Sequence, residues 1–226
     1  MNIDFSKYPL PKRLRHHTSP NFYMPVNAMK GIPAYYPPVH EKINWSKYFI
    51  NGKIPDMLDI GCGKGSFLFQ IALNNPDKNI LGIELRLLPV QWIEGVIKGE
   101  GLENAGVMWY SVVNGMHFIN DVTIDAAFYL FPDPWPKKKH NKRRAFNQNL
   151  LKELHRILKN DGKLYLASDL KEIHNYHIET LNSSGLFIFE EIINDSNWGL
   201  PVTNKEKFCR ENNIEFYRLK CCKMVQ

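Results

Sequence analysis

The sequence contains few cysteines and no long apolar run, and these two absences exclude several classes of protein. Its four cysteines, Cys62, Cys209, Cys221 and Cys222, form no C-x-x-C pair, so neither a structural zinc site nor a disulfide framework is expected. No stretch approaches the roughly 18 apolar residues that a membrane helix requires. The first residues show no basic flank followed by an apolar block, so a secretory signal is not expected. We therefore predict a cytoplasmic protein without a membrane partner or a metal.

The composition is that of an ordinary globular protein with a modest excess of positive charge. Of the 226 residues, 44% are hydrophobic and 12% aromatic, which is enough for one domain to bury a substantial core. Lys and Arg number 29 against 23 Asp and Glu, and the resulting net charge of +6 favours an anionic partner only weakly. The composition leaves open whether the protein is a monomer or a homodimer.

The first 50 residues differ from the rest of the chain. They hold seven of the fourteen prolines, many aromatic residues and a basic cluster formed by Lys12, Arg13, Arg15, His16 and His17. No helical or strand periodicity persists there. We therefore predict an irregular N-terminal arm over residues 1–50, which lies over the domain or becomes ordered on a partner, followed by one domain over residues 51–226.

From about residue 55, short apolar runs alternate with amphipathic stretches. We expect strands at 57–60, 79–83, 107–111, 124–130 and 164–167, and helices near 66–75, 87–99, 142–159 and 171–184. Asp161-Gly162 is expected to close the third helix. Two further strand-like runs, 186–192 and 214–220, have no helix of similar length between them and predict a hairpin. The pattern is typical of an α/β, Rossmann-like fold with a mostly parallel sheet and an antiparallel C-terminal strand.

A glycine-rich loop follows the first predicted strand and opens the first predicted helix. Gly61, Gly63 and Gly65 allow sharp turns and let a ligand approach where a Cβ would clash. The dinucleotide fingerprint requires Gly or Ala where this chain has Ser66, so the loop is G-x-G-x-G, the form associated with S-adenosylmethionine. Glu84 ends the second predicted strand, where a carboxylate can accept from both ribose hydroxyls. The alternative is a tight turn beside a surface glutamate.

Each of the five predicted parallel strands is followed by a distinctive residue. These are the glycines after the first strand, then Glu84, Asn114, Asp133 and Asp169 after the next four. Because ligands of open α/β sheets bind at the carboxyl ends of the strands, we expect these residues to form one site.

A stiff basic loop follows the fourth predicted strand. It reads Phe131-Pro-Asp-Pro-Trp-Pro-Lys-Lys-Lys-His-Asn-Lys-Arg-Arg144, and its prolines fix φ around Asp133 and Trp135. Six of the eight residues 137–144 are Lys or Arg. A basic run is usually a solvated face, but this one adjoins the predicted ligand edge and therefore favours an anionic substrate. A stacking ring beside phosphate-binding charges suits a nucleic-acid base.

Together with the D-I-G-C-G-K-G loop, this basic segment resembles the tRNA (guanine-N7-)-methyltransferase family, from about residue 30 to the end of the chain. The resemblance implies a class I methyltransferase domain that transfers methyl from S-adenosylmethionine to N7 of the variable-loop guanine of tRNA, position 46. With the glycines, the expected cofactor contacts are Asp59, Gly61, Gly63, Gly65, Glu84, Asn114 and Asp133. The implied substrate contacts are Lys137, Asp169 and Thr203 to Glu206, and the RNA-contacting segment, Lys139 to Arg144, adds His140, Lys142 and Arg143.

Two departures from the family pattern concern the site. The family often has Asp where Asn114 stands, and the Asn carbonyl can still accept from an adenine amino group. The family's Thr-x-aromatic-Glu motif reads Thr203-Asn204-Lys205-Glu206 here, so the stacking ring is missing and a charge replaces it.

The chemistry assigns roles to the acidic residues. Guanine N7 carries a lone pair and no proton, so the reaction needs no general base. We expect the carboxylate of Asp133 to offset the positive charge that develops on guanine. Asp169 and Glu206 are expected to accept from the guanine N1–H and amino group, and His140 to contact a phosphate or orient Asp133.

Three other functions stay open at this point. The first is an N-methyltransferase of a small molecule or a protein, with an incidental basic loop. The second is a non-catalytic RNA-binding module, which the intact glycine loop and Glu84 disfavour. The third is an NAD-dependent oxidoreductase, which Ser66 disfavours.

Overall fold

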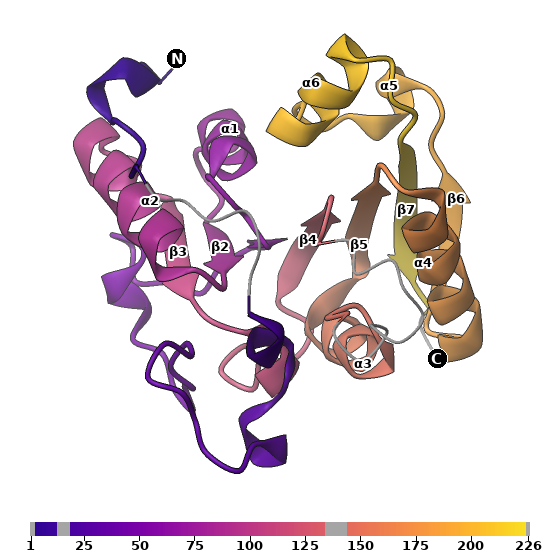
Figure 1. Ribbon diagram of the computed structural model, residues 1–226, viewed down its shortest axis with the longest axis horizontal. Coiled ribbons are helices and arrows are strands. Elements are labelled where there is room, and N and C mark those ends of the chain that lie inside the picture. Colours follow the sequence, from indigo (N-terminus) through magenta and orange to yellow (C-terminus); the bar gives the residue numbers. More distant parts are fainter. Residues whose placement is uncertain (1–2, 13–18, 134–143, 225–226) are drawn as a thin grey trace.

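The computed structural model describes residues 3–12, 19–133 and 144–224. Within them lies one seven-stranded sheet in the order β3-β2-β1-β4-β5-β7-β6 (Figure 1). The strands are β1 (Met57–Ile60), β2 (Ile80–Glu84), β3 (Ala105–Trp109), β4 (Ile124–Leu130), β5 (Leu158–Ser168), β6 (Phe187–Glu191) and β7 (Tyr217–Lys223). The first five run parallel, and β7 is antiparallel to both of its neighbours. The predicted α/β fold is therefore confirmed.

Helices cover both faces of the sheet. They are α1 (Ser66–Asn74), α2 (Leu87–Glu100), α3 (Gln148–Ile157) and α4 (Lys171–Ser184), with α5 (Asp195–Trp198) and α6 (Asn204–Glu211) near the C-terminus. Side chains of β1 alternate between the faces: Met57 belongs to the core under α1 and α2, and Leu58 to the core under α3. Both faces of β1 are buried, which explains why all of its residues except Asp59 are apolar.

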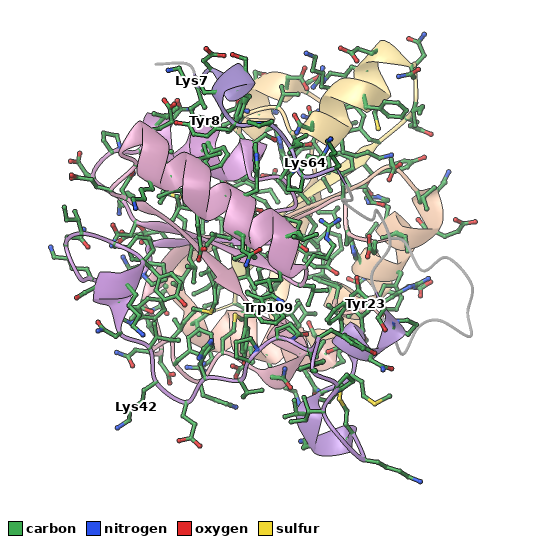
Figure 2. All side chains as sticks on the ribbon, turned by 60° about the vertical axis from the view of Figure 1, so that its left-hand side comes forward. Lys7, Tyr8, Tyr23, Lys42, Lys64 and Trp109 are labelled. Carbon is green, nitrogen blue, oxygen red and sulfur yellow. The ribbon has the colours of Figure 1, made fainter. Side chains whose placement is uncertain are left out.

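The described part of the N-terminal arm packs against the domain as irregular chain and short 3-10 turns. These turns are Phe5–Lys7, Pro20–Tyr23, Val26–Ala28 and Trp45–Lys47. Tyr8 lies beside α2, where its hydroxyl donates to Glu100 (2.8 Å) and its carbonyl accepts from Trp92 (3.1 Å) (Figure 2). Farther along, Phe49 is buried in the core on the α3 face. Of the predicted basic cluster, all but Lys12 lies outside the described residues.

The prediction for the end of the third helix was wrong. The helix α3 ends at Ile157, and Leu158 already has extended geometry as the first residue of β5. The pairing of β5 with β4 shifts between Ile124 and Ala126, which face Leu158 and Lys163, so β5 bulges between these two pairs. Asp161-Gly162 therefore lies inside a strand. A glycine within a strand pattern marks such a bulge as readily as it marks a helix end.

The start of that helix also differs from the prediction. The predicted start at 142 lies outside the described residues, and the described chain becomes helical only at Gln148. Asn147 caps the helix because its side chain accepts from the N–H groups of Asn149 (2.9 Å) and Leu150 (3.1 Å). The apolar periodicity extends past both helix ends because Phe146 and Leu158 face the same core.

The last two strands are neighbours, but they do not form a simple hairpin. Two short helices, α5 and α6, stand between β6 and β7 in the chain; neither was predicted, although no helix as long as α2 or α4 lies there. Figure 1 shows both helices together, beyond the carboxyl ends of β4 and β5. The short, polar α6 is stabilised by ion pairs to other elements, from Arg210 to Asp195 of α5 and from Glu206 to Arg218 of β7, which a reading of apolar periodicity does not detect.

The bulge in β5 yields a stability prediction. A Cβ on Gly162 would stand 2.9 Å and 3.0 Å from the backbone O and N of Lys159 and 3.1 Å from the carbonyl of Ile124. Because backbone cannot move aside cheaply, Gly162→Ala should lower the free energy of unfolding by about 1–3 kcal/mol in urea titration. The control is Gly95→Ala within α2, where no atom approaches a Cβ and stability should stay equal or rise. A loss at Gly162 no larger than at Gly95 would contradict the bulge.

Candidate active site

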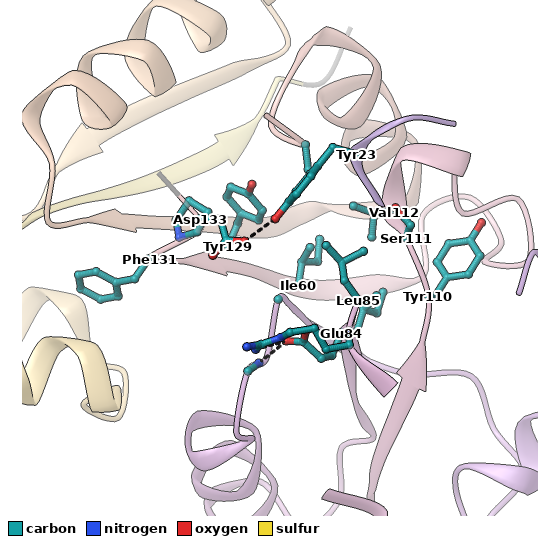
Figure 3. Close-up of a pocket in the computed structure, with 16 residues that line it drawn as sticks. Tyr23, Ile60, Glu84, Leu85, Tyr110, Ser111, Val112, Tyr129, Phe131 and Asp133 are labelled. Carbon is teal, nitrogen blue, oxygen red and sulfur yellow. Dashed lines mark hydrogen bonds and ion pairs between the residues drawn. The ribbon is translucent and has the colours of Figure 1, made fainter. Parts of the chain in front are cut away.

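A pocket opens at the carboxyl ends of the four strands β1 to β4 (Figure 3). Its lining comes from the segments that leave these strands, together with one residue of the N-terminal arm. The lining residues are Tyr23, Ile60, Gly61, Gly63, Ile83, Glu84, Leu85, Arg86, Tyr110, Ser111, Val112, Tyr129, Phe131, Pro132, Asp133 and Ala145. Three of the predicted positions, the glycine loop, Glu84 and Asp133, therefore share one cavity.

The glycine loop between β1 and α1 needs glycine for two different reasons. Gly61 (φ +80°) and Gly63 (φ +60°) are left-handed, and no side chain or neighbouring segment lies near the place of their Cβ atoms apart from one carbonyl at 3.9 Å. At Gly65 (φ +71°) a Cβ would stand 3.0 Å from Ile93 and 3.1 Å from Phe69. The first two glycines thus keep a space open for a ligand, whereas the third allows α1 and α2 to pack closely.

The carboxylate of Glu84 accepts four hydrogen bonds in the pocket. Its carboxylate accepts from the N–H of Gly63 (3.0 Å) and from the backbone N–H of Arg86 (3.0 Å). The guanidinium of Arg86 adds two bonds, from Nε (2.8 Å) and Nη2 (3.2 Å). Since a carboxylate has about four acceptor positions, Arg86 occupies those that would serve a ligand. The carboxylate links the ends of β1 and β2.

Asp59 lies behind the glycine loop as a second buried carboxyl group. It is 4% exposed, and Oδ2 has no hydrogen-bond partner among the described residues. Burial, and after it the negative charge of Glu84, raises the pKa of Asp59 to about 7.

Asp133 is held at the opposite wall of the pocket. The hydroxyl of Tyr23 donates to Oδ2 of Asp133 over 2.7 Å (Figure 3). The chain before Asp133 is fixed because the N–H of Phe131 donates to the carbonyl of Ala167 (2.8 Å) at the end of β5. Phe131 itself has a left-handed φ of +50°, which turns the chain sharply. Both constraints set the position of the carboxylate.

Asn114 does not line the pocket but anchors the N-terminal arm beside it. Its side-chain oxygen accepts from the N–H of Val26 (2.9 Å), and its amide donates to the hydroxyl of Tyr36 (2.9 Å). Nearby, Ser111 donates to the carbonyl of Phe22 (2.6 Å). Asn114, Ser111 and Asp133 thus all form hydrogen bonds to the arm segment 22–36.

The predicted substrate residues near the C-terminus lie apart from this pocket, around α6. Thr203 caps α6 by accepting from the N–H of Glu206 (3.0 Å). Glu206 is 1% exposed, and its carboxylate pairs with Arg210 (2.6 Å) and Arg218 (3.7 Å). Asp169 follows β5 and pairs with Lys205 (2.7 Å). Of the two predicted acceptors, only Asp169 keeps an accessible carboxylate.

Most of the predicted RNA-contacting segment cannot be placed. Lys137, Lys139, His140, Lys142 and Arg143, together with Trp135, lie outside the described residues. Arg144 is described, and its guanidinium lies 4.2 Å from the centre of the Tyr176 ring on α4.

Sequence reasoning missed Tyr23, Arg86 and the pairing of Lys205. Arg86 stands two residues after Glu84, so an adjacent cation was visible in the sequence. Tyr23 lies 110 residues before Asp133, and no local pattern connects the two. The sequence showed Lys205 as a departure from the family motif, but it did not indicate that Lys205 pairs with Asp169.

Among the described residues, no helix is both long and apolar enough to cross a membrane. Among the same residues, His, Cys, Asp and Glu side chains form no group of three or more that could hold a metal ion.

Comparison with known proteins gives matches along most of the chain. A family model described as "Putative methyltransferase" matches residues 53–219. The tRNA (guanine-N(7)-)-methyltransferase of Lactobacillus gasseri is 31% identical over 150 residues, 66% of this chain and 69% of the relative. The one from Synechococcus sp. (strain JA-3-3Ab) is 30% identical over 212 residues, 92% of this chain and 85% of the relative.

A solved structure shares the fold. The SAM-dependent O-methyltransferase of Thermotoga maritima matches with a TM-score of 0.53 at 18% identity, covering 77% of this chain and 61% of that chain. At this identity the likeness concerns the fold alone.

Asp59 yields a pH prediction. Its folded-state pKa of about 7 exceeds the unfolded value of about 3.9. Between these values the unfolded chain releases a proton that the folded protein keeps, so the free energy of unfolding should decline by up to about 4 kcal/mol as pH rises from 4 to 7. Asp59→Asn should remove this decline and be more stable than the wild type at pH 8, measured by urea unfolding without ligand. The exposed Asp77→Asn serves as control, and equal slopes for all three proteins would contradict the prediction.

Proposed function

Because this chain belongs to the tRNA (guanine-N(7)-)-methyltransferase family, we propose that it transfers a methyl group from S-adenosylmethionine to N7 of the variable-loop guanine of tRNA. One observation carries the proposal beyond the family match: Gly61, Gly63, Glu84 and Asp133 line a single pocket. A cofactor loop, a ribose-binding carboxylate and a carboxylate for the reacting base would thus surround one space.

The residues around the glycine loop fit the cofactor. Open space at Gly61 and Gly63 accepts an adenosyl group against the backbone, and the unpartnered Oδ2 of Asp59 offers an acceptor. Glu84 would hold the ribose hydroxyls once Arg86, which is 25% exposed, turns away and frees two acceptor positions. When bound, the cofactor supplies an electrophilic methyl group on a sulfonium.

Asp133 would act on the base electrostatically. Guanine N7 has no proton to lose, so the reaction requires alignment and charge stabilisation and no general base. Positive charge grows on guanine during transfer, and a fixed carboxylate stabilises that state more than the ground state. Tyr23 would be a positioning residue, because its hydroxyl holds Oδ2 of Asp133 in place.

The substrate would extend from this pocket toward α6 and the basic segment. Asp169 is accessible and can accept from the guanine N1–H and amino group. Thr203 and Glu206 would support this wall indirectly, because Thr203 caps α6 and Glu206 pairs with the buried Arg218 of β7. The RNA phosphates would be bound by Arg144 and by five further residues, Lys137, Lys139, His140, Lys142 and Arg143.

The other functions considered from the sequence have weaker support. A small-molecule or protein methyltransferase would share the cofactor pocket, but the relatives named above are tRNA enzymes. A non-catalytic RNA-binding module would not need open space at Gly61 and Gly63. An NAD-dependent oxidoreductase is disfavoured by Ser66, which stands where the dinucleotide fingerprint requires Gly or Ala.

Mass spectrometry of nucleosides tests the proposed function directly. Unmodified tRNA incubated with the protein and S-adenosylmethionine should yield N7-methylguanosine from the variable loop. Small amines and peptides, incubated in parallel, should stay unmethylated. Methylation of those compounds with none in tRNA would establish the small-molecule or protein alternative, and absence of both S-adenosylmethionine binding and methylation would favour the non-catalytic module.

Asp133→Asn tests the electrostatic role. The amide keeps the shape and an oxygen that can accept from Tyr23, but it removes the negative charge. The single-turnover rate at saturating tRNA and S-adenosylmethionine should fall about 10²-fold, while tRNA affinity changes little because phosphate contacts dominate it. The control is Asp121→Asn, at an exposed aspartate paired with Arg156. A rate within about threefold of the wild type would leave Asp133 only a loop-shaping role.

A further inference from the structure

A lysine–aspartate pair lies on the same edge of the sheet as the pocket. Nζ of Lys205 lies 2.7 Å from Oδ2 of Asp169, and the two side chains are 42% and 22% exposed. Lys205 stands in the first turn of α6, and its ammonium also lies 5.2 Å from the centre of the Phe208 ring. The pair is accessible and oriented, unlike the neighbouring buried Glu206.

The fold brings this pair to the carboxyl end of β5, next to the segment that carries Asp133. β4 and β5 run in parallel register with Leu130 opposite Ala167, so Asp133 and Asp169 follow neighbouring strand ends. Asn204, the residue before Lys205, lines a surface groove together with Lys64 of the glycine loop. The pair therefore lies on the same edge of the sheet as Asp133, and α6 connects it to a groove that reaches the glycine loop.

We propose that Lys205 and Asp169 together read the Watson–Crick edge of the target guanine, with Lys205 donating to O6 and Asp169 accepting from N1–H and the amino group. This inference rests on the proposed function and deepens it, because Lys205 becomes a specificity-determining residue. An ammonium has three donors and a carboxylate about four acceptor positions, so both groups keep capacity for a base after pairing with each other.

The arrangement discriminates guanine from adenine by the order of its donors and acceptors. Guanine presents an acceptor at O6 beside a donor at N1, which matches a cation beside a carboxylate. Adenine presents an amino donor beside an unprotonated N1. In the same position, its amino group would face the ammonium of Lys205, and the lone pair of its N1 would face the carboxylate of Asp169. Polar groups that are left unpaired in a site reduce the reactivity of the wrong base far more than the loss of an apolar contact does.

The paired charges also suit the reaction. The nucleophile N7 lies on the other edge of the base, so donation to O6 from the Watson–Crick side leaves the N7 lone pair available. The charge of Lys205 is offset by Asp169, so the cation that forms on guanine meets little net repulsion from the pair.

Base analogues in the tRNA test the proposal. Three tRNAs carry guanosine, 6-thioguanosine or inosine at the target position; sulfur is a weak acceptor in place of O6, and inosine lacks the amino group. The wild type should methylate the thio analogue about 10-fold or more slowly than guanosine in single-turnover assays. In Lys205→Met that difference should shrink to within about threefold, while the penalty for inosine persists.

Matched variants make the result specific to Lys205. Lys207→Met removes the same charge from the same helix at a more exposed position, and it should keep the wild-type ratio of guanosine to thio analogue. Asp169→Asn should instead reduce the penalty for inosine. Lys205→Arg, which keeps a charged donor, should retain much of the discrimination at O6.

Three outcomes would overturn the inference. An equal loss on all three tRNAs, with a log–log salt slope lower by about 0.7 to 0.9, would show that Lys205 contacts a phosphate. Faster methylation of guanosine by Lys205→Met would show that Lys205 obstructs N7. Unchanged rates and ratios would show that it contacts neither. Failure of the wild type to methylate any tRNA would instead overturn the proposed function itself.

Discussion

The parallel register of β2, β1, β4 and β5 is the constraint on which the site depends. Parallel strands share a direction, so each carboxyl end delivers its following residue to the same edge. The glycine loop, Glu84 and Asp133 meet there although about seventy residues separate Gly61 from Asp133 in the chain, and Asp169 follows the neighbouring strand end. Glu84 then connects the ends of two strands, because its carboxylate accepts from the N–H of Gly63 after β1 and from the N–H of Arg86 after β2. Loss of this register by one residue would turn Asp59 and its neighbours to the opposite face of the sheet.

The sequence predicted those parts of the structure that local patterns determine. Buried parallel strands such as β1 and β4 read as continuous apolar runs, and both were placed with their observed bounds. The glycine loop and Glu84 were recognisable because close approach of a ligand restricts the residue type at each position. Asp133 and Asp169 were recognisable because each follows a predicted parallel strand, and the family resemblance then implied a role for each.

Contacts between distant segments could not be predicted. Gly162 has the same sequence signature at a strand bulge as at a helix end, and only the pairing of β4 with β5 distinguishes the two. The polar helix α6 is held in place by ion pairs. Arg210 of α6 pairs with Glu206 one turn earlier and with Asp195 of α5, and Asp195 pairs in turn with Arg218 of β7. Glu206 illustrates the consequence: the family motif marked it as a substrate contact, but its buried carboxylate pairs with Arg210 and Arg218.

The bonds between the N-terminal arm and the pocket also determine when the site can be completed during synthesis. Val26 and Tyr23 leave the ribosome early, but their partners Asn114 and Asp133 follow 88 and 110 residues later. The arm can therefore dock only after β1 to β4 have formed the edge of the sheet that carries Asn114 and Asp133. The loops that it closes are long, yet the entropic cost of closure grows only slowly with length, so late docking is not prohibitive. The enzyme would acquire its fold first and its reactive geometry last.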